Sequence, residues 1–147
     1  MTAIRRAEAT WSGPLATGSG TVSGISSNTF GDLPVSWSAR TEGPDSQTSP
    51  EELLAAAHSA CFAMALSGAL GRAGSPPERL DVSAEVTFDK LDAGWRVVSS
   101  AITVRGRVPG ISAADFAAAA EETRTGCPIS RALANNVALT VAATLEA

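Results

Sequence analysis

The chain has 147 residues, 44% of them hydrophobic, so it is long enough to bury a core without cross-links, and its length predicts one domain over residues 1–147. Eleven basic and fifteen acidic residues give a net charge of -4, and the basic residues are spread along the chain, which argues against nucleic acid or an anionic membrane as a partner. No apolar run follows Arg5 and Arg6, and Ser and Gly interrupt the longest apolar segment. We therefore expect a soluble, cytoplasmic protein with neither signal peptide nor membrane span.

The first third of the chain predicts short strands followed by the start of a helix. Residues 8–25 carry two short segments separated by Gly and Pro, a pattern typical of a hairpin. Residues 34–40 alternate between apolar and polar types and predict a further strand that ends at Arg40. After a loop at 43–47, Pro50 occupies a predicted first helical position, with acidic residues in the first turn.

A long apolar helix is expected next, at the centre of the fold. From Leu53 to Leu70 the chain is apolar nearly all round the helix, and glycines mark its end. A single small sheet cannot cover every side of such a helix. A second subunit could cover the remainder.

The rest of the chain predicts a hairpin, two helices and a final strand. Residues 80–90 and 95–107 alternate as long strands joined by a tight turn. A capping box predicts a helix from Ser112 to about Arg124. A short helix at 128–133 and a strand at 137–145 are expected after it. This order predicts an α+β domain in which helices cover one face of a largely antiparallel sheet.

The central helix carries Cys61 in apolar surroundings, where burial raises the pKa of a thiol and makes it inert. A reactive Cys61 therefore requires a nearby positive group. Arg40 is the candidate, because a guanidinium held in a fork by Glu51 could present its remaining donors to a thiolate and to a substrate oxygen. Arg40 is interpreted equally well as a solvated charge. Glu51 lies about 15 Å along the helix from Cys61, so contact requires a bridging cation or Glu51 of a neighbouring chain.

Glu52 has a structural role in this interpretation. If Ser49 is the N-cap, Glu52 is the third helical residue and can reach back to the Ser49 backbone amide, completing a capping box.

Cys127 and His58 each allow a structural and a chemical interpretation. Cys127 stands at the N-cap of the helix opened by Pro128, and a helix N-terminus stabilises a thiolate, which on this argument alone makes it the more activated thiol. A lone cysteine before proline is nevertheless usually structural. His58 shares a helix face with Cys61 and could bind a metal or act as a base to the thiol. We favour a packed, hydrogen-bonded histidine.

Two cysteine motifs give the sequence a family resemblance. They are TSPEELLAAAHSACFAMAL at 48–66 and GCPISRAL at 126–133, and shorter matches run from ATWSG at 9–13 through GSGTVS at 18–23 and RTEG at 40–43 to DKLDAG at 89–94. Together they resemble the OsmC branch of the OsmC/Ohr family over the whole chain. Two separate cysteine motifs with an acid and an arginine in register form a specific pattern.

The resemblance implies an α+β fold with antiparallel sheets around a long central buried helix, assembled as an intertwined homodimer with two active sites at the subunit interface. The implied activity is that of a thiol-dependent peroxidase for organic hydroperoxides, without a metal or other cofactor. Cys61 is the implied peroxidatic cysteine and Cys127 the resolving one. Arg40 and Glu51 are the implied pair that activates the thiolate and orients the peroxide. The dimer would also cover the apolar helix.

The implied cycle begins when the Cys61 thiolate attacks the distal peroxide oxygen. The resulting sulfenic acid condenses with Cys127, and an external dithiol, such as a lipoyl protein, reduces the disulfide. A resolving thiol that is itself partly ionised suits this exchange. The alternative is a non-enzymatic dimer that binds a metal or a small ligand through His58, Cys61 and Cys127.

Overall fold

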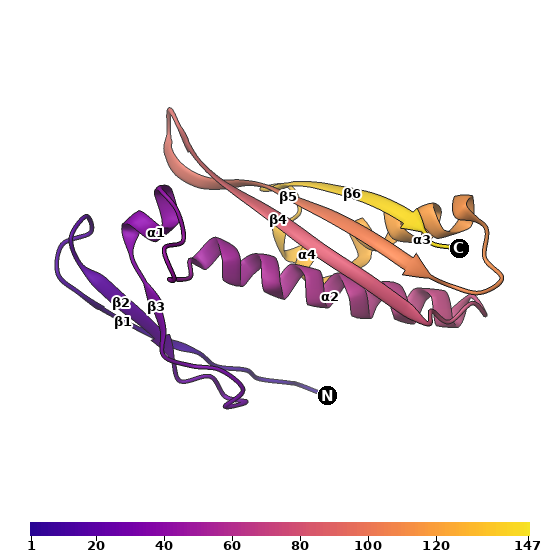
Figure 1. Ribbon diagram of the computed structural model, residues 1–147, viewed down its shortest axis with the longest axis horizontal. Coiled ribbons are helices and arrows are strands. Elements are labelled where there is room, and N and C mark those ends of the chain that lie inside the picture. The colour runs from indigo at the N-terminus through magenta and orange to yellow at the C-terminus, as the bar shows by residue number, and fades with distance from the viewer. The chain divides into compact units, whose positions relative to one another are not determined.

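The computed structural model describes residues 1–147 and divides them into two compact units, Met1–Leu53 and Leu54–Ala147 (Figure 1). The long helix α2 (Pro50–Arg72) begins in the first unit and continues in the second. The single domain that the length predicts for residues 1–147 stays a prediction.

The N-terminal unit contains a three-stranded antiparallel sheet in the order β1-β2-β3. Its strands are β1 (Glu8–Ser12), β2 (Ser19–Ser23) and β3 (Leu33–Val35). Gly20 pairs with Trp11, and a Cβ added at Gly20 would come within 2.8 Å of the Trp11 ring. The glycine therefore lets the indole lie across the neighbouring strand, and the hairpin expected over 8–25 is confirmed.

The strand predicted for residues 34–40 is wrong beyond Val35. A short helix, α1 (Trp37–Thr41), takes its place, because the Ser36 hydroxyl accepts a hydrogen bond from the Ala39 amide at 3.1 Å and caps the first turn. Over so few residues, alternation does not distinguish a strand from a capped helical turn. Arg40 consequently lies in the last turn of α1 instead of at the end of a strand.

Helix α2 starts as expected, with Pro50 first and the Ser49 hydroxyl accepting from the Glu52 amide at 3.1 Å. Only this half of the predicted capping box forms. The Glu52 carboxylate accepts a hydrogen bond from the Thr48 hydroxyl at 3.0 Å instead of reaching the Ser49 amide. After Arg72 the chain leaves the helix through Gly74, whose φ of +84° suits a glycine.

The C-terminal unit contains a second three-stranded sheet in the order β4-β5-β6. Its strands are β4 (Arg79–Leu91), β5 (Gly94–Arg107) and β6 (Ala138–Leu145). β4 and β5 form the expected antiparallel hairpin, whereas β6 pairs with β5 in parallel. Three of the four strand pairings in the chain are therefore antiparallel, and the α+β class is confirmed.

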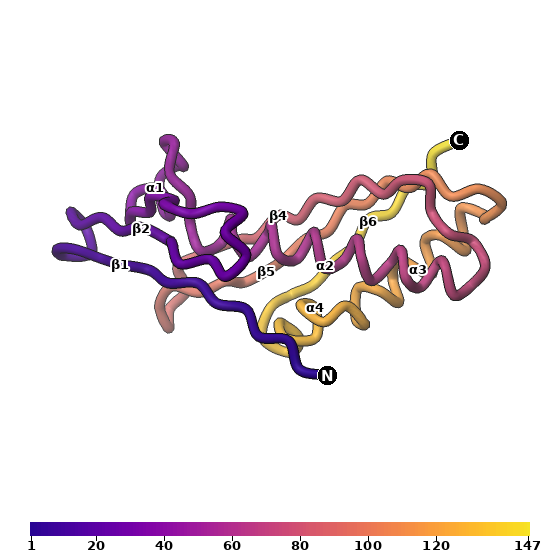
Figure 2. The backbone as a smooth tube through the Cα atoms, turned by 90° about the horizontal axis from the view of Figure 1, so that it is seen from below, coloured from indigo at the N-terminus to yellow at the C-terminus, as the bar shows by residue number.

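Helices cover one face of this second sheet. Helix α2 and α3 (Ala113–Gly126) lie side by side along it, and α4 (Pro128–Leu133) follows α3 directly (Figure 2). The buried core forms between the inward-facing residues of the sheet and the helices. Its members are Phe62, Leu66, Leu70, Ile102, Val104, Val108, Phe116, Ala120 and Cys127. Gly106 admits the Phe116 ring, since an added Cβ would lie within 2.6 Å of it.

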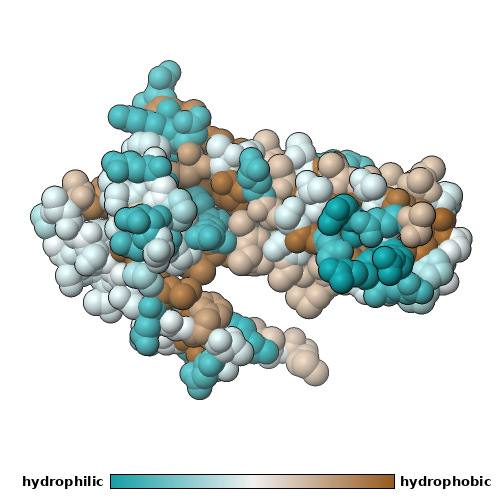
Figure 3. Space-filling view, viewed as in Figure 1, coloured by the Kyte–Doolittle hydropathy of each residue, from teal (hydrophilic) through white to brown (hydrophobic).

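Within one chain, α2 is buried along only one stripe. That stripe repeats every four residues, at His58, Phe62, Leu66 and Leu70, whereas Met64 keeps 71% of its surface exposed. Figure 3 shows apolar surface along the middle of α2, which runs below β4 and β5 in this view. By length and composition α2 would suffice to cross a membrane, a test that the core helices of soluble proteins also pass. As the sequence predicts, the sheet of one chain leaves an apolar side of α2 uncovered.

Candidate active site

Two free thiols face each other inside the C-terminal unit. The Sγ atoms of Cys61, on α2, and Cys127, between α3 and α4, lie 3.1 Å apart. Cys127 is completely buried and Cys61 is partly exposed. A disulfide bond is about 2.05 Å long, so the pair needs to close by only about 1 Å to form one.

The position of Cys127 follows from the proline after it. A residue before proline is kept out of the α region, and Cys127 adopts φ -57° and ψ 133°. Its amide still donates to the Thr123 carbonyl at 2.9 Å, and its carbonyl accepts from the Arg131 amide at 2.9 Å. Cys127 is thus both the C-cap of α3 and the N-cap of α4. Its backbone is hydrogen-bonded to both helices.

The surroundings of Cys61 within this unit disfavour its thiolate. Burial raises the pKa of the Cys61 thiol above its ordinary value, and the neighbouring Cys127 adds to this effect. A hydrogen bond from the Ile129 backbone amide, in the first turn of α4, acts in the opposite direction. The net direction is upward, so ionisation near neutral pH requires a positive charge from outside these contacts.

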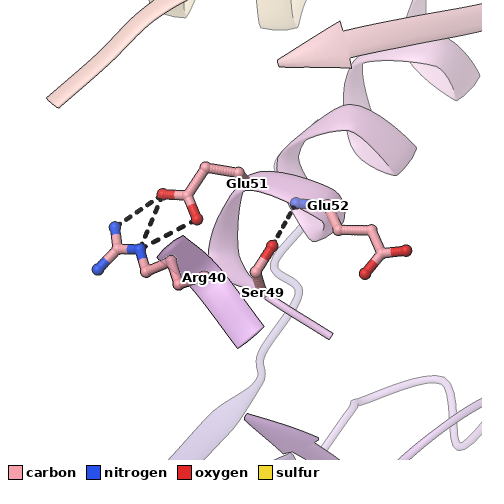
Figure 4. Close-up of polar contacts among 4 residues, drawn as sticks. All are labelled: Arg40, Ser49, Glu51 and Glu52. Atoms are coloured by element: carbon pink, nitrogen blue, oxygen red, sulfur yellow. Dashed lines mark hydrogen bonds and ion pairs between the residues drawn. The ribbon is translucent and has the colours of Figure 1, made fainter. Parts of the chain in front are cut away.

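The N-terminal unit holds an arginine in a fork. The Nε atom of Arg40 donates to both Glu51 carboxylate oxygens at 3.0 Å, and its Nη2 donates to Oε1 at 2.7 Å (Figure 4). The Arg40 side chain retains 30% of its exposure, whereas that of Glu51 retains 9%. The Trp37 ring centroid lies 5.8 Å from Arg40 Cζ, and an aromatic face at this distance attracts a cation. The guanidinium is therefore oriented by a carboxylate and by an indole.

The four residues expected at the site fall into two pairs. Arg40 and Glu51 form one pair in the N-terminal unit, and Cys61 and Cys127 form the other in the C-terminal unit. The structure brings together the members of each pair.

His58 is buried and fully hydrogen-bonded, as the favoured interpretation predicts. Its exposed fraction is 1%, its Nδ1 lies 2.7 Å from the Ser100 hydroxyl, and its Nε2 lies 2.8 Å from the Ser130 hydroxyl. Burial lowers its pKa. Both ring nitrogens are therefore occupied, and no group of three His, Cys, Asp or Glu side chains is arranged to hold a metal ion. These contacts count against His58, Cys61 and Cys127 as a metal site.

Sequence reasoning missed the two serines. Ser100 occupies an inward position of β5, in line with Ile102 and Val104, where a polar residue on an otherwise apolar strand face was the available signal. Ser130 gives no comparable signal, because it lies in a helix too short to show a periodic pattern.

Comparisons with known proteins agree with this architecture. The family model described as OsmC-like protein matches residues 43–142. Peroxiredoxin OsmC of Escherichia coli is 40% identical over 139 residues, covering 95% of this chain and 96% of the relative. The organic hydroperoxide resistance protein OhrA of Bacillus subtilis is 29% identical over 116 residues, covering 75% of this chain and 77% of the relative.

A solved structure shows the same fold at low identity. The OsmC-like protein from Mycoplasma pneumoniae superposes with a TM-score of 0.75 at 14% sequence identity, covering 100% of both chains. The fold and the sequence matches together define the class: the chain belongs to the OsmC-like family.

Proposed function

We propose that this protein is a peroxiredoxin-type peroxidase that reduces organic hydroperoxides to alcohols through its two cysteines. The observation that carries the proposal is the 3.1 Å separation of the Cys61 and Cys127 sulfur atoms. The relatives named peroxiredoxin OsmC and organic hydroperoxide resistance protein OhrA support the enzyme class and the substrate class. The reductant is an external dithiol, for which a lipoyl protein is one source.

In the first step the Cys61 thiolate attacks the distal oxygen of the hydroperoxide. The O–O bond breaks, the sulfur gains a hydroxyl group and becomes a sulfenic acid, and the alkoxide leaves and takes up a proton to give the alcohol. Cys61 is the better attacking group because it retains exposure, whereas Cys127 is completely buried.

In the second step the Cys127 sulfur, as thiolate, attacks the sulfenic sulfur of Cys61. A disulfide forms, and hydroxide leaves and is protonated to water. Exchange with an external dithiol then regenerates both thiols and oxidises the dithiol to its own disulfide. The short distance between the two sulfur atoms supports this step without a large rearrangement.

Arg40 supplies the positive charge that Cys61 lacks in its own unit. Its guanidinium, held by Glu51, stabilises the thiolate and the negative charge that develops on the leaving oxygen. The raised pKa of the Cys61 thiol supports the need for such a group.

The active protein is a homodimer in the cytoplasm. Support comes from a stripe of exposed residues along α2, one every three or four positions, formed by Ala56, Ala60, Met64, Ser67 and Gly71. Small side chains on an uncovered helix face allow a second helix to approach closely, and burial of this face removes apolar surface from water.

A turnover assay tests the proposed function. Consumption of a bulky alkyl hydroperoxide and of hydrogen peroxide is compared with dihydrolipoamide or reduced thioredoxin as the electron donor. We expect the wild-type protein to turn over the alkyl hydroperoxide with a dithiol donor. We expect Cys61→Ala to lose this turnover. Absence of alkyl hydroperoxide turnover with both donors would overturn the proposal.

A further inference from the structure

A buried polar chain crosses the core beside the thiol pair. His58 on α2 links Ser100 on β5 to Ser130 on α4, and all three side chains are at most 1% exposed. Burying a polar group costs desolvation free energy unless the group forms hydrogen bonds. Here each ring nitrogen of His58 has a hydrogen-bond partner. Apolar residues of similar size would fill the same space without this requirement.

The chain of hydrogen bonds ends on the segment that carries Cys127. Ser130 is the third residue after Cys127, within the first turn of α4. A helix of six residues has little stability of its own, so its position depends on tertiary contacts. The His58 to Ser130 bond is a fully buried side-chain contact that ties α4 to the helix bearing Cys61.

The second step of the proposed cycle is sensitive to this position. The Cys127 sulfur must approach the Cys61 sulfur from 3.1 Å to about 2.05 Å, along the line opposite the departing oxygen. A displacement of about 1 Å in a reacting group can cost about 100-fold in rate. The backbone of Cys127 is bonded to Thr123 in α3 and to Arg131 in α4, so its position depends on where these two helices lie.

We propose that His58 is a positioning residue for the resolving thiol, holding α4 through Ser130 so that Cys127 stays aligned with the sulfenic acid of Cys61. This inference rests on the proposed function. His58 touches neither the peroxide nor the reacting sulfur atoms, and it acts through the placement of α4. Its bond to Ser100 satisfies the other ring nitrogen and does not contact α4.

Two conservative substitutions of His58 each keep one of its two hydrogen bonds and remove the other. In Gln the side-chain amide reaches the place of the imidazole Nε2, and in Asn it reaches the place of Nδ1. His58→Gln therefore keeps the bond to Ser130, whereas His58→Asn keeps only the bond to Ser100. Both variants bury a neutral amide, which makes each a control for the other. Ser130→Ala and Ser100→Ala cut the same two bonds from the opposite ends.

The test measures the two steps separately in single-turnover experiments with one equivalent of an alkyl hydroperoxide. Loss of the Cys61 thiol reports the first step, and formation of the Cys61–Cys127 disulfide, quenched and counted by mass spectrometry, reports the second. We expect the first step to be unchanged in all four variants. Disulfide formation should slow by about tenfold or more in His58→Asn and Ser130→Ala, with sulfenic acid trapped by dimedone, but stay near the wild-type rate in His58→Gln and Ser100→Ala.

Other outcomes overturn the inference. Equal slowing in all four variants would assign His58 a general structural role, and normal disulfide formation in Ser130→Ala would remove the link through α4. Failure of the proposed function has a different signature, because the wild-type protein would then form neither sulfenic acid nor disulfide. If His58→Asn fails to fold, the two serine variants decide the result alone.

Discussion

The sulfur atoms of Cys61 and Cys127 lie 3.1 Å apart although the residues are separated by 66 positions in the chain. The long helix α2 positions Cys61. Cys127 is positioned by the break between α3 and α4 that Pro128 enforces. In the proposed function the two thiols have different tasks, because Cys61 is partly exposed whereas Cys127 is completely buried.

Removal of the buried thiol separates oxidation from resolution. In Cys127→Ser we expect Cys61 to react with hydroperoxide but form no disulfide, so that excess oxidant carries it to the sulfinic acid. Intact-mass measurements over increasing hydroperoxide should show added oxygen on this variant and none on Cys61→Ser. Turnover of Cys127→Ser at the wild-type rate without overoxidation would contradict the assignment of Cys127.

The Arg40 and Glu51 pair should control ionisation of Cys61. In Arg40→Met we expect the pKa of the Cys61 thiol to rise, because a positive charge that opposes the effect of burial is then lost, and kcat/KM for the hydroperoxide to fall by about 100-fold. The rate of alkylation by iodoacetamide across pH measures the ionisation directly.

A matched control exists on the sheet. Arg79 is also held in a fork, with bonds of 2.8 and 2.7 Å to Asp81, but it is exposed. Arg79→Met should leave alkylation and turnover unchanged. Identical alkylation profiles for Arg40→Met and wild type would remove Arg40 from the mechanism.

The uncovered stripe of α2 should decide the oligomeric state. A carboxylate introduced by Ala60→Glu would be buried without a partner between two chains, so sedimentation should show a dimer for the wild type and a monomer for this variant. Ser83→Glu, on the exposed face of β4, should remain dimeric. A wild-type monomer at micromolar concentration would contradict the proposed assembly.

Buried His58 should make the fold sensitive to mild acid. Burial keeps its pKa below the ordinary value of 6.5, so the unfolded chain binds a proton more readily than the folded one. The contribution of neutral His58 is therefore complete above pH 6.5 and is lost as the pH falls toward its folded-state pKa.

Urea denaturation at about pH 7.5 and about pH 5.5 measures this effect. The free energy of unfolding should fall more on acidification in the wild type than in His58→Gln, which cannot titrate. Equal losses in both proteins would show that another group carries the pH dependence.

Much of the fold could be predicted from local patterns. Alternation and a tight turn predict the β4–β5 hairpin, and Ser112 and Pro128 mark the starts of two helices that form where expected. Helix α1 could not be recognised, because in residues 34–40 a serine cap overrides a short alternating pattern. The parallel pairing of β6 with β5 depends on long-range packing that no local pattern encodes.

The candidate site was predictable to a similar degree. The residue types and the family resemblance indicate Cys61, Cys127, Arg40 and Glu51, and the structure supplies the 3.1 Å approach and the carboxylate fork. The partners of His58 lie 42 and 72 residues away in sequence. Only the folded chain shows that its two serines connect the sheet to the segment that carries Cys127.

The most direct test treats the fully reduced protein with one equivalent of an alkyl hydroperoxide, blocks the remaining thiols and maps the peptides by mass spectrometry. The account predicts a Cys61–Cys127 disulfide within each chain and one molecule of alcohol for each disulfide formed. Recovery of both thiols in the free form, with the hydroperoxide unconsumed, would contradict it.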